Sequence, residues 1–419
     1  MSSWQTRKLG HISEMCLGKM LDVEKNKGEF QPYLANINVR WGGFDFTNLN
    51  KMRFENSEQD RYGLKFGDLV VCEGGEPGRC AIWKDQVPGM KIQKALHRVR
   101  VHESYSNEFI YYRMLLAGRN GELAKHFIGS TIKHLTGIGL KQVEFSYPQF
   151  VEQQKIAAVL SALDAKIECN NRINAELEAM SRTLYDYWFV QFDFPDANGK
   201  PYKSSGGKMV YNATLKREVP EGWVTEPLVQ SCEVIDCLHS KKPNSAFEDK
   251  CFYLLQLENI LDNGQIDLSK KYFVSQSDYQ LWTTRIEVKK HDVVMTNAGR
   301  VAAFAQIPSN VVCGIGRNIT AIRPKAINPN FFFLSLSGQH VQKQILANLD
   351  QGAFFKSFNV KGIKVLNLLR PYQEIEKQFE KTVVSFIEKR HGVAAENAVL
   401  AQHRDWLLPL LMNGQVTVA

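Results

Sequence analysis

An internal repeat constrains this chain more than any other feature of its sequence. Residues 129–188 align without a gap with residues 352–411. Gly139 then falls on Gly362, and Pro148 falls on Pro371. Self-similarity over such a length predicts two copies of one structural unit in a single chain.

The match continues upstream with small gaps, although the copies diverge most in their first two-thirds. The upstream pairs are Trp4–Leu9 with Trp223–Leu228, Lys65–Val71 with Lys289–Met295, Gly78–Ala81 with Gly299–Ala302, and Gln93–Leu96 with Gly316–Ile319.

Each copy begins with a globular part, residues 1–147 in the first and residues 223–370 in the second. Both parts are rich in short apolar alternations broken by Gly, Pro, Asn and Asp, which favour strands and turns. Phe109 to Leu116 is expected to add a helix, and the apolar cluster Phe331 to Leu334 has the length of a strand. The pattern predicts an α+β fold with two mixed, strand-rich globular domains.

Each globular part is followed by a long predicted helix, residues 148–191 and 371–413. A proline opens each helix, and apolar positions then recur in steps of four and three. An average step of 3.5 defines a coiled-coil seam, so we expect the two helices to pair as an antiparallel coiled coil. The residues predicted to pair the helices and to dock partners are Leu160, Leu163, Ile167, Asn174, Leu177, Leu184, Val383, Phe386, Asn397, Leu400 and Leu407.

The predicted seam also contains polar residues. Asn174 and Asn397 occupy the same seam position in the two copies, and they either fix the register as buried amides or lie at a solvated edge. Arg390, Gly392 and Arg404 make the second seam more polar than the first, which argues against uniform tight packing. Residues 192–222, rich in Pro, Gly, Asn and Ser, are predicted to connect the two copies.

Composition restricts the class of protein less sharply than the repeat does. A net charge of +8 on 419 residues suits a polyanionic partner and equally suits an ordinary basic enzyme. The sequence contains no signal-like apolar region and no run of roughly 18 apolar residues, so we expect a cytoplasmic protein without a membrane span. The eight cysteines form no Cys-x-x-Cys pair, which favours free thiols over a metal site.

Catalytic motifs are missing from the whole sequence. It contains no Gly-x-x-x-x-Gly-Lys-Ser/Thr and no Gly-x-Gly-x-x-Gly. The Asn-Pro-Pro-Tyr string expected of an adenine methyltransferase is also absent, because Asn328-Pro329 is followed by Asn330. We therefore expect a binding protein with no catalytic residue and no metal or cofactor of its own.

Candidate DNA contacts lie in turn-like segments at matching positions of the two copies. Arg and Lys neutralise phosphates, Arg can fork onto guanine, and Asn and Gln suit adenine. For each residue the alternative is a solvated surface charge or amide, and Trp83 and Phe304 are expected in the core. The predicted DNA-binding residues are Arg79, Gln93, Lys94, Lys133, Asn297, Arg300, Arg317, Asn318 and Lys356.

Three strings carry a resemblance to a known family over essentially the whole chain. They are Trp4-x-x-x-x-Leu9-Gly10 with its repeat at Trp223, Gly129–Lys133 followed by Pro148 to Ala157, and the connector from Phe192 to Gly207. In their order and duplication they resemble the specificity subunit of type I restriction–modification enzymes.

The resemblance implies two target-recognition domains, each reading one half of a split, asymmetric site in double-stranded DNA. It implies that the paired helices set the distance between the half-sites and dock two methyltransferase subunits, with two motor–nuclease subunits joining the full complex. Adenine methylation, ATP hydrolysis and cleavage, with their S-adenosylmethionine, ATP and Mg²⁺, would then belong to the partners. A stand-alone DNA-binding regulator and a coiled-coil scaffold that ignores DNA remain as alternatives.

Overall fold

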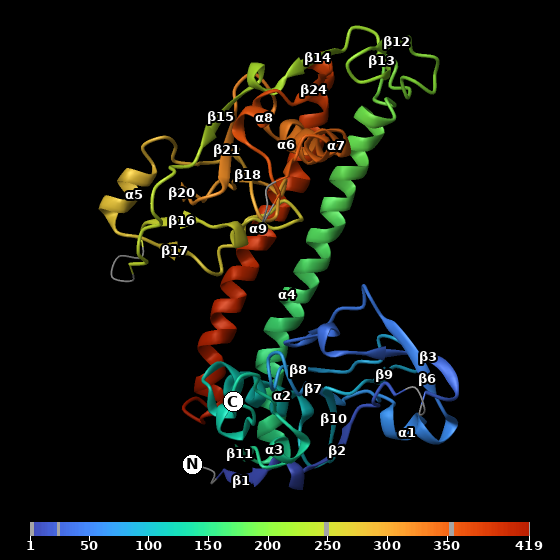
Figure 1. Cartoon of the computed structure of the whole chain (residues 1–419), viewed down its shortest axis with the longest axis vertical. Coiled ribbons are helices and arrows are strands. Elements are labelled where there is room, and N and C mark those ends of the chain that lie inside the picture. The colour runs from blue at the N-terminus through green and yellow to red at the C-terminus, as the bar shows by residue number, and fades with distance from the viewer. Residues whose placement is uncertain (1–3, 23–25, 247–250, 352–355, 419) are drawn as a thin grey trace. The chain divides into compact units, whose positions relative to one another are not determined.

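The computed structural model describes residues 4–22, 26–246, 251–351 and 356–418. The chain divides into two compact units. Unit 1 comprises Met1–Ile167 and Leu400–Ala419, and unit 2 comprises Glu168–Val399. Each unit therefore holds one globular part together with a segment of each long helix (Figure 1).

Unit 1 is built on a four-stranded antiparallel sheet of order β2-β10-β7-β8 and a three-stranded sheet of order β6-β3-β9. A short ladder between β1 and β11 closes the globular part at its base. The strands are β1 (Gln5–Lys8), β2 (Ser13–Leu17), β3 (Glu29–Leu34), β4 (Val39–Arg40), β5 (Gly43–Phe44), β6 (Asn50–Phe54), β7 (Leu69–Cys72), β8 (Cys80–Ile82), β9 (Lys91–Ile92), β10 (Leu96–Val101) and β11 (Glu144–Tyr147); the helices are α1 (Gln59–Tyr62), α2 (Asn107–Arg119) and α3 (Gly137–Lys141).

Unit 2 repeats this topology, with sheets of order β15-β21-β18-β19 and β17-β16-β20 and a closing β14–β24 ladder. The same strand order in both units confirms the repeat inferred from the sequence. The strands are β12 (Met209–Asn212), β13 (Arg217–Pro220), β14 (Val224–Pro227), β15 (Cys232–Asp236), β16 (Tyr253–Leu255), β17 (Tyr272–Phe273), β18 (Val293–Thr296), β19 (Phe304–Gln306), β20 (Gly314–Ile315), β21 (Ile319–Pro324), β22 (Asp350–Gln351), β23 (Lys356–Ser357) and β24 (Asn367–Arg370); the helices are α5 (Gln276–Trp282), α6 (Pro329–Ser337), α7 (Gln339–Ala347) and α8 (Val360–Lys364).

The same buried ion pair braces the central strands of both units. Arg100 on β10 donates two hydrogen bonds to Asp68, at 2.8 and 2.7 Å. In unit 2, Arg323 on β21 makes the same fork to Asp292, at 2.8 and 2.6 Å. Such bidentate pairs fix geometry as well as charge, so they hold the turn before β7 or β18 in one place.

One predicted pairing of the repeat is wrong by three residues. In the β7–β8 hairpin Val71 lies opposite Cys80, and in the β18–β19 hairpin the equivalent Met295 lies opposite Phe304. Arg79 therefore corresponds to Ala303, and the Gly78–Ala81 string does not correspond to Gly299–Ala302. The sequence alignment matched two Gly-Arg dipeptides, whereas hairpin register decides which residues are equivalent.

Backbone conformation supports the corrected register. Gly78 and the equivalent Ala302 both have positive φ, at 92° and 64°. In the same register Arg300 takes the place of Glu76. Trp83 and Phe304 are both almost fully buried, which confirms their predicted place in the core.

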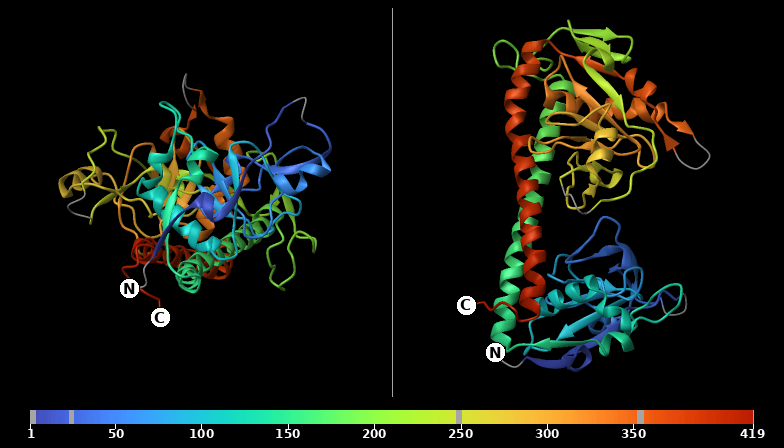
Figure 2. Two further views of the ribbon diagram at one scale, coloured as in Figure 1. Left: turned by 90° about the horizontal axis from the view of Figure 1, so that it is seen from below. Right: turned by 90° about the vertical axis from the view of Figure 1, so that its left-hand side faces the viewer.

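The two long helices are α4 (Phe150–Tyr185), extended by a π-helical turn over Asp186–Val190, and α9 (Gln373–Met412). Their bounds lie within two residues of the predicted 148–191 and 371–413. In each unit a segment of α4 lies antiparallel to a segment of α9 (Figure 2). Arg404 binds Asp164 at 2.8 Å in unit 1, and Arg390 binds Glu178 at 3.3 Å in unit 2.

The predicted helix-pairing residues are all buried or half-buried. Asn174 is buried, which removes the alternative of a solvated edge. Asn397 is half-buried and accepts a hydrogen bond from Asn170 Nδ2 at 2.9 Å. The polar seam residues Arg390 and Arg404 are accommodated by carboxylate partners on α4.

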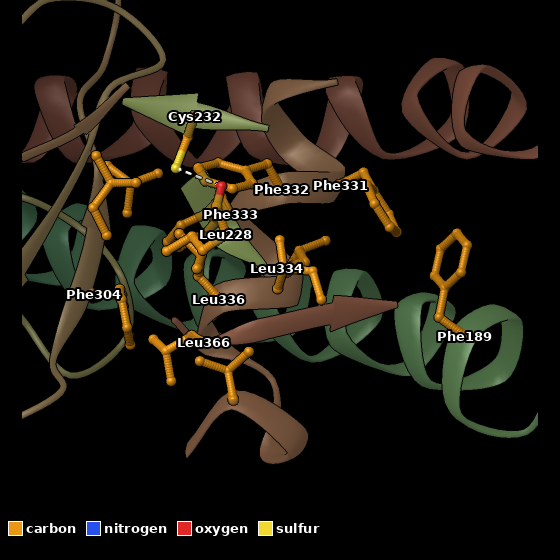
Figure 3. Close-up of a cluster of buried hydrophobic side chains, with 14 of the residues drawn as sticks. Phe189, Leu228, Cys232, Phe304, Phe331, Phe332, Phe333, Leu334, Leu336 and Leu366 are labelled. Atoms are coloured by element: carbon orange, nitrogen blue, oxygen red, sulfur yellow. Dashed lines mark hydrogen bonds between the residues drawn. The ribbon is translucent and has the colours of Figure 1, made fainter. Parts of the chain in front are cut away.

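The main core of unit 2 joins the globular part to the helices. Phe331, Phe332 and Phe333 of α6 pack with Phe189 and with Phe379 of α9 (Figure 3). The segment Phe331–Leu334 is therefore helical, not a strand, because Pro329 in the first turn and the Asn328 cap start a helix there. A corresponding core in unit 1 surrounds α2 and includes Leu160 of α4 and Leu408 of α9.

Candidate nucleic-acid interface

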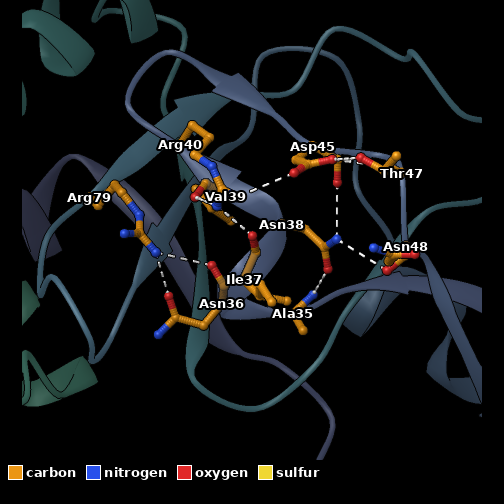
Figure 4. A network of polar contacts seen from close by, with 10 residues as sticks. All are labelled: Ala35, Asn36, Ile37, Asn38, Val39, Arg40, Asp45, Thr47, Asn48 and Arg79. Atoms are coloured by element: carbon orange, nitrogen blue, oxygen red, sulfur yellow. Dashed lines mark hydrogen bonds and ion pairs between the residues drawn. The ribbon is translucent and has the colours of Figure 1, made fainter. Parts of the chain in front are cut away.

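A 3-10 turn with the same buried asparagine anchors one loop in each unit. Asn38 ends the turn η2 (Asn36–Asn38), and Asn259 ends the turn η7 (Leu257–Asn259). Asn38 Oδ1 accepts from the Ala35 amide at 2.9 Å, and its Nδ2 donates to the Asp45 carbonyl at 3.0 Å (Figure 4). Asn259 makes the same two contacts with Gln256 and Asp267, at 2.7 and 2.8 Å. The two turns are therefore equivalent residue by residue.

Four loops converge around the end of β7 in unit 1. Asn36 Nδ2 donates to the Gly74 carbonyl at 2.6 Å, which ties the 3-10 turn to the loop after β7. The amide of Glu73 donates to the Ala95 carbonyl at 2.9 Å. The amide of Leu135 donates to the Glu73 carbonyl at 2.7 Å. We call the surface formed by residues 36–41, 73–79, 93–95 and 128–135 loop surface 1.

Unit 2 assembles the same surface from equivalent bonds. The amide of Asn297 donates to the Asn318 carbonyl at 2.8 Å, and the amide of Phe358 donates to the Asn297 carbonyl at 2.9 Å. We call the surface formed by residues 257–262, 297–302, 316–318 and 356–358 loop surface 2. The structure thus brings the predicted DNA-binding residues of each copy together; the predicted Gly352 loop lies outside the described residues.

Four of the predicted cations are exposed and unpaired on these surfaces. Lys94 and Lys133 lie on loop surface 1, and Arg317 and Lys356 lie on loop surface 2. Within the described part of the chain none of the four has an ion-pair partner, so each can neutralise a phosphate without breaking an internal contact. Asn318 is exposed as well, whereas Gln93 and Asn297 are half-buried.

The turns that present Lys94 and Arg317 share a left-handed residue. Ala95 has a φ of 83°, and the equivalent Asn318 has a φ of 64°. A left-handed conformation costs a non-glycine residue energy and persists only where the surrounding contacts hold it. Here the carbonyls of both residues are held by the amides of Glu73 and Asn297. The backbone of the two turns is therefore the same, while the side chains differ.

Arg79 and Arg300 differ from the other predicted cations, because both guanidinium groups are occupied by internal contacts. Arg79 Nη2 donates to Asn36 Oδ1 at 2.8 Å and to the Asn36 carbonyl at 3.1 Å. Its Nη1 lies 3.2 Å from Glu76, and only 18% of the side chain is exposed. Arg300 Nη1 binds Asp262 at 2.8 Å, and its Nη2 donates to the carbonyls of Ile260 and Leu257.

A polar pair lies beneath each surface, and of its members the sequence prediction had named only Asn297, as a DNA contact. His97 Nε2 lies 3.4 Å from Glu73, and burial lowers the pKa of this histidine. In unit 2 the equivalent positions hold Thr320 and Asn297, joined by a hydrogen bond of 2.6 Å. Glu73 and Asn297 directly follow β7 and β18, whereas His97 and Thr320 are the second residues of β10 and β21.

Metal and membrane binding receive little support from the described residues. Among the described residues, one group of three possible metal ligands has its ligand atoms within 4.8 Å of one another: Asp236, Cys237 and His239. His239 Nε2 already lies 2.7 Å from Asp236, so the pair is satisfied without an ion. No disulfide joins the cysteines in the described part of the chain. In the portion of the chain that the structure describes, no helix is long and apolar enough to cross a membrane.

Comparisons with known proteins agree with this picture. Residues 1–179 match the family model of the type I restriction modification DNA specificity domain. The chain is 25% identical over 355 residues to the type I restriction enzyme MjaIX specificity subunit of Methanocaldococcus jannaschii, which covers 84% of this chain and 78% of that protein. It is 24% identical over 351 residues to the type I restriction enzyme HindI specificity subunit of Haemophilus influenzae, covering 73% and 74%.

The fold also matches a solved structure. The type I restriction-modification S subunit from M. genitalium aligns with 98% of this chain and 96% of its own, at a TM-score of 0.57 and 15% identity. The duplicated fold is thus shared with that solved S subunit. Over most of its length the chain is similar to type I restriction enzyme specificity subunits, and its first 179 residues match the model of their DNA specificity domain.

Proposed function

We propose that this chain reads a bipartite, asymmetric DNA sequence through loop surfaces 1 and 2. This proposal depends on the observation that the two surfaces have the same backbone arrangement but present different side chains. Gln93 corresponds to Gly316, Ala95 to Asn318, and Glu76 to Arg300. Because base edges are read by side chains, two surfaces of the same shape and different chemistry suit two different half-sites.

Within this proposal the exposed cations and amides take different roles. Lys94, Lys133, Arg317 and Lys356 neutralise phosphates and position the protein on the duplex. Asn318 and Gln93 are placed to read base edges, where Asn and Gln suit adenine, whereas Asn297 is held by Thr320 beneath loop surface 2. A scaffold that ignores DNA would not need four unpaired cations at equivalent places, so we set that alternative aside.

The chain acts, in this proposal, with two methyltransferase subunits and, in the full complex, two motor–nuclease subunits. Adenine methylation and DNA cleavage occur in those partners, which bring S-adenosylmethionine, ATP and Mg²⁺. Seam residues such as Leu160 and Val383 are buried inside the units, so docking falls to the outer helix faces. Trp406 on α9 is 66% exposed, and exposed tryptophans are frequent anchors of protein interfaces.

A domain exchange tests modular reading. The chain is co-expressed with the adenine methyltransferase of its own system, and methylated sites are mapped by genome-wide methylome sequencing. Residues 223–370 are then replaced by the equivalent segment of a relative, so that the β14–β24 ladder is exchanged as a whole. We expect one half of the site to change and the other half to stay.

The matched control replaces residues 1–147, which include the whole β1–β11 ladder, and should change the other half-site instead. A change in both half-sites after either exchange would contradict independent reading. Methylation without any sequence preference in the parent complex would refute the proposed function itself.

A further inference from the structure

Two arginines at non-equivalent positions of the repeat donate to equivalent backbone carbonyls, one in each unit. Arg79 Nη2 contacts the carbonyl of Asn36 at 3.1 Å, and Arg300 Nη2 contacts the carbonyl of Leu257 at 3.4 Å. Asn36 and Leu257 are each the first residue of the equivalent turns η2 and η7. In the hairpin that follows, however, Arg300 takes the place of Glu76 and not of Arg79. The two copies thus reach one arrangement from two different sequence positions.

Each guanidinium joins the 3-10 turn to the hairpin loop after the central strand. Arg79 spans from its place before β8 to Asn36 (Figure 4). It also pairs with Glu76 inside the loop. Arg300 spans from the loop after β18 to the carbonyls of Leu257 and Ile260 and to Asp262. The carbonyls of Asn36 and Leu257 each accept the amide three residues further on, so the arginine supplies a second donor and ties the turn to the hairpin loop.

The remaining donors of Arg79 do not allow a fork onto a base. Both Nη2 hydrogens are committed to Asn36, and one Nη1 hydrogen is committed to Glu76. Nε is buried, with no hydrogen-bond partner among the described atoms. A bidentate contact to guanine needs two adjacent donors, so Arg79 would have to give up the turn in order to read a base.

We propose that Arg79 and Arg300 are positioning residues for DNA reading and do not contact DNA themselves. This inference rests on the proposed function of the loop surfaces. Each arginine clamps its 3-10 turn against the hairpin loop and so fixes the rim on which exposed residues such as Ile37 and Arg40 are presented. Side-chain placement at a binding site is held by the residues that support it, and a loosened support loses discrimination.

A positioning residue and a phosphate contact predict different salt dependence. Losing one phosphate contact reduces the slope of log K against log salt by about 0.9 and weakens binding to every sequence alike. Losing a clamp leaves that slope unchanged and lowers discrimination at one half-site. Simple loss of folded protein would lower the active fraction and leave the ratio of affinities for matched and mismatched sites unchanged.

The test uses the full chain in complex with its methyltransferase partner and a duplex that carries the mapped site. Binding is measured by fluorescence anisotropy over a salt series, with duplexes scrambled in one half-site or the other. For Arg79→Ala we expect at least a 10-fold loss of discrimination at the half-site read by unit 1. Discrimination at the other half-site and the salt slope should stay as in the parent. Arg79→Lys, which can keep one of the contacts, should lose less.

Lys94→Ala is the matched control on the same surface, and it should reduce the salt slope by about 0.9 with discrimination unchanged. Arg300→Ala should act like Arg79→Ala, but at the other half-site. If Arg79→Ala prevents folding, Asn36→Ala removes the Oδ1 acceptor of Arg79 and the Nδ2 bond to the Gly74 carbonyl, both of which tie the turn to the loop, and should reduce discrimination in the same direction. A slope change for Arg79→Ala that equals that of Lys94→Ala would overturn the inference. A parent complex without sequence preference would refute the proposed function instead.

Discussion

At the scale of single residues, unit 2 holds a histidine in an unfavourable electrostatic environment. His391 on α9 lines a cavity of about 300 Å³ together with Lys290, His291 and Glu388. Burial, and after it the neighbouring charges of Arg390, His291 and Lys290, lower the pKa of His391 to about 4. The imidazole is therefore neutral in the folded protein at neutral pH.

This histidine should make unit 2 sensitive to acid. The pKa of His391 in the folded protein lies below its unfolded value of roughly 6.5, so the unfolded chain takes up the proton first. The stability contribution is fully present above about pH 6.5 and is lost as the pH falls towards 4. We expect His391→Gln to remove up to about 3 kcal/mol of the acid destabilisation over that window. Urea unfolding at a series of pH values measures the difference.

The exposed His403 lies on the same helix, and His403→Gln should leave the pH profile of the parent unchanged. Other partly buried histidines, including His97 and His340, also have lowered pKa values, so some acid sensitivity will remain in His391→Gln. Identical pH profiles for His391→Gln and the parent would show that His391 is not the group responsible.

The sequence predicted least well which side chains of the candidate site are free and which are held by internal contacts. Turn residues and matching positions located Lys94, Arg317 and Asn318 on exposed loops. The same reasoning placed Arg79 among the free cations, although its guanidinium is bound by Asn36, 43 residues away along the chain. A contact of that range depends on how β7 and β8 pair and on where the 3-10 turn lies, and no local pattern encodes either.

At the scale of elements, the helix pair shows an asymmetry that the repeat does not. Asn397 is bonded to Asn170 and Asn171, both at 2.9 Å. The antiparallel register set by the Asn170–Asn397 and Glu178–Arg390 contacts places Asn174 opposite Val393 and Ala394. Asn174 is the repeat equivalent of Asn397, but it faces apolar residues, and its Oδ1 is buried without a partner among the described atoms.

Replacing the two asparagines of α4 should therefore have opposite effects. Asn174→Leu removes an unsatisfied buried acceptor and adds apolar contact with Val393, so we expect a gain of about 1 kcal/mol. Asn170→Leu leaves Asn397 Oδ1 without its donor, so we expect a loss of about 1–3 kcal/mol. Guanidinium unfolding followed by circular dichroism compares the two variants with the parent. Equal destabilisation by both would mean that Asn174 Oδ1 has a partner in solution.

The elements of the fold whose signals are local in the sequence could be predicted. Those that depend on pairing between distant segments could not. The ends of α4 and α9 follow from a proline and an apolar period, and the structure confirms both helices. The four consecutive apolar residues of helix α6 have the length of a strand, but such a run fits a helix equally well, and the Asn328 cap and Pro329 decide for the helix. The two sheet orders could not be predicted, since strands such as β2 and β10 pair across some 80 residues of sequence.

At the scale of the whole molecule, two reading surfaces in one chain require something to set the distance between the half-sites. The family resemblance assigns this task to the long helices, and the sequence alone suggests the end of α4, just before the connector, as the place to lengthen them. The structure argues against that place. Tyr185, Trp188 and Phe189 pack against Phe379, and Phe189 also contacts Phe331, so an insertion there would disrupt the core of unit 2.

The insertion belongs where the two units part, after Ile167 in α4 and after Val399 in α9. Four residues in each helix keep the helix contacts of both units intact and lengthen each helix by about 6 Å. We predict that both half-sites are kept and that the unread spacer grows by one or two base pairs, at roughly 3.4 Å per base pair. Methylome sequencing of cells that express the variant with its methyltransferase reads the spacer directly. The same insertion in α4 alone would put the Asp164–Arg404 contact of unit 1 out of register with the Asn170–Asn397 contact of unit 2 and should abolish activity. An unchanged spacer with full activity in the double insertion would show that the helices do not set the distance.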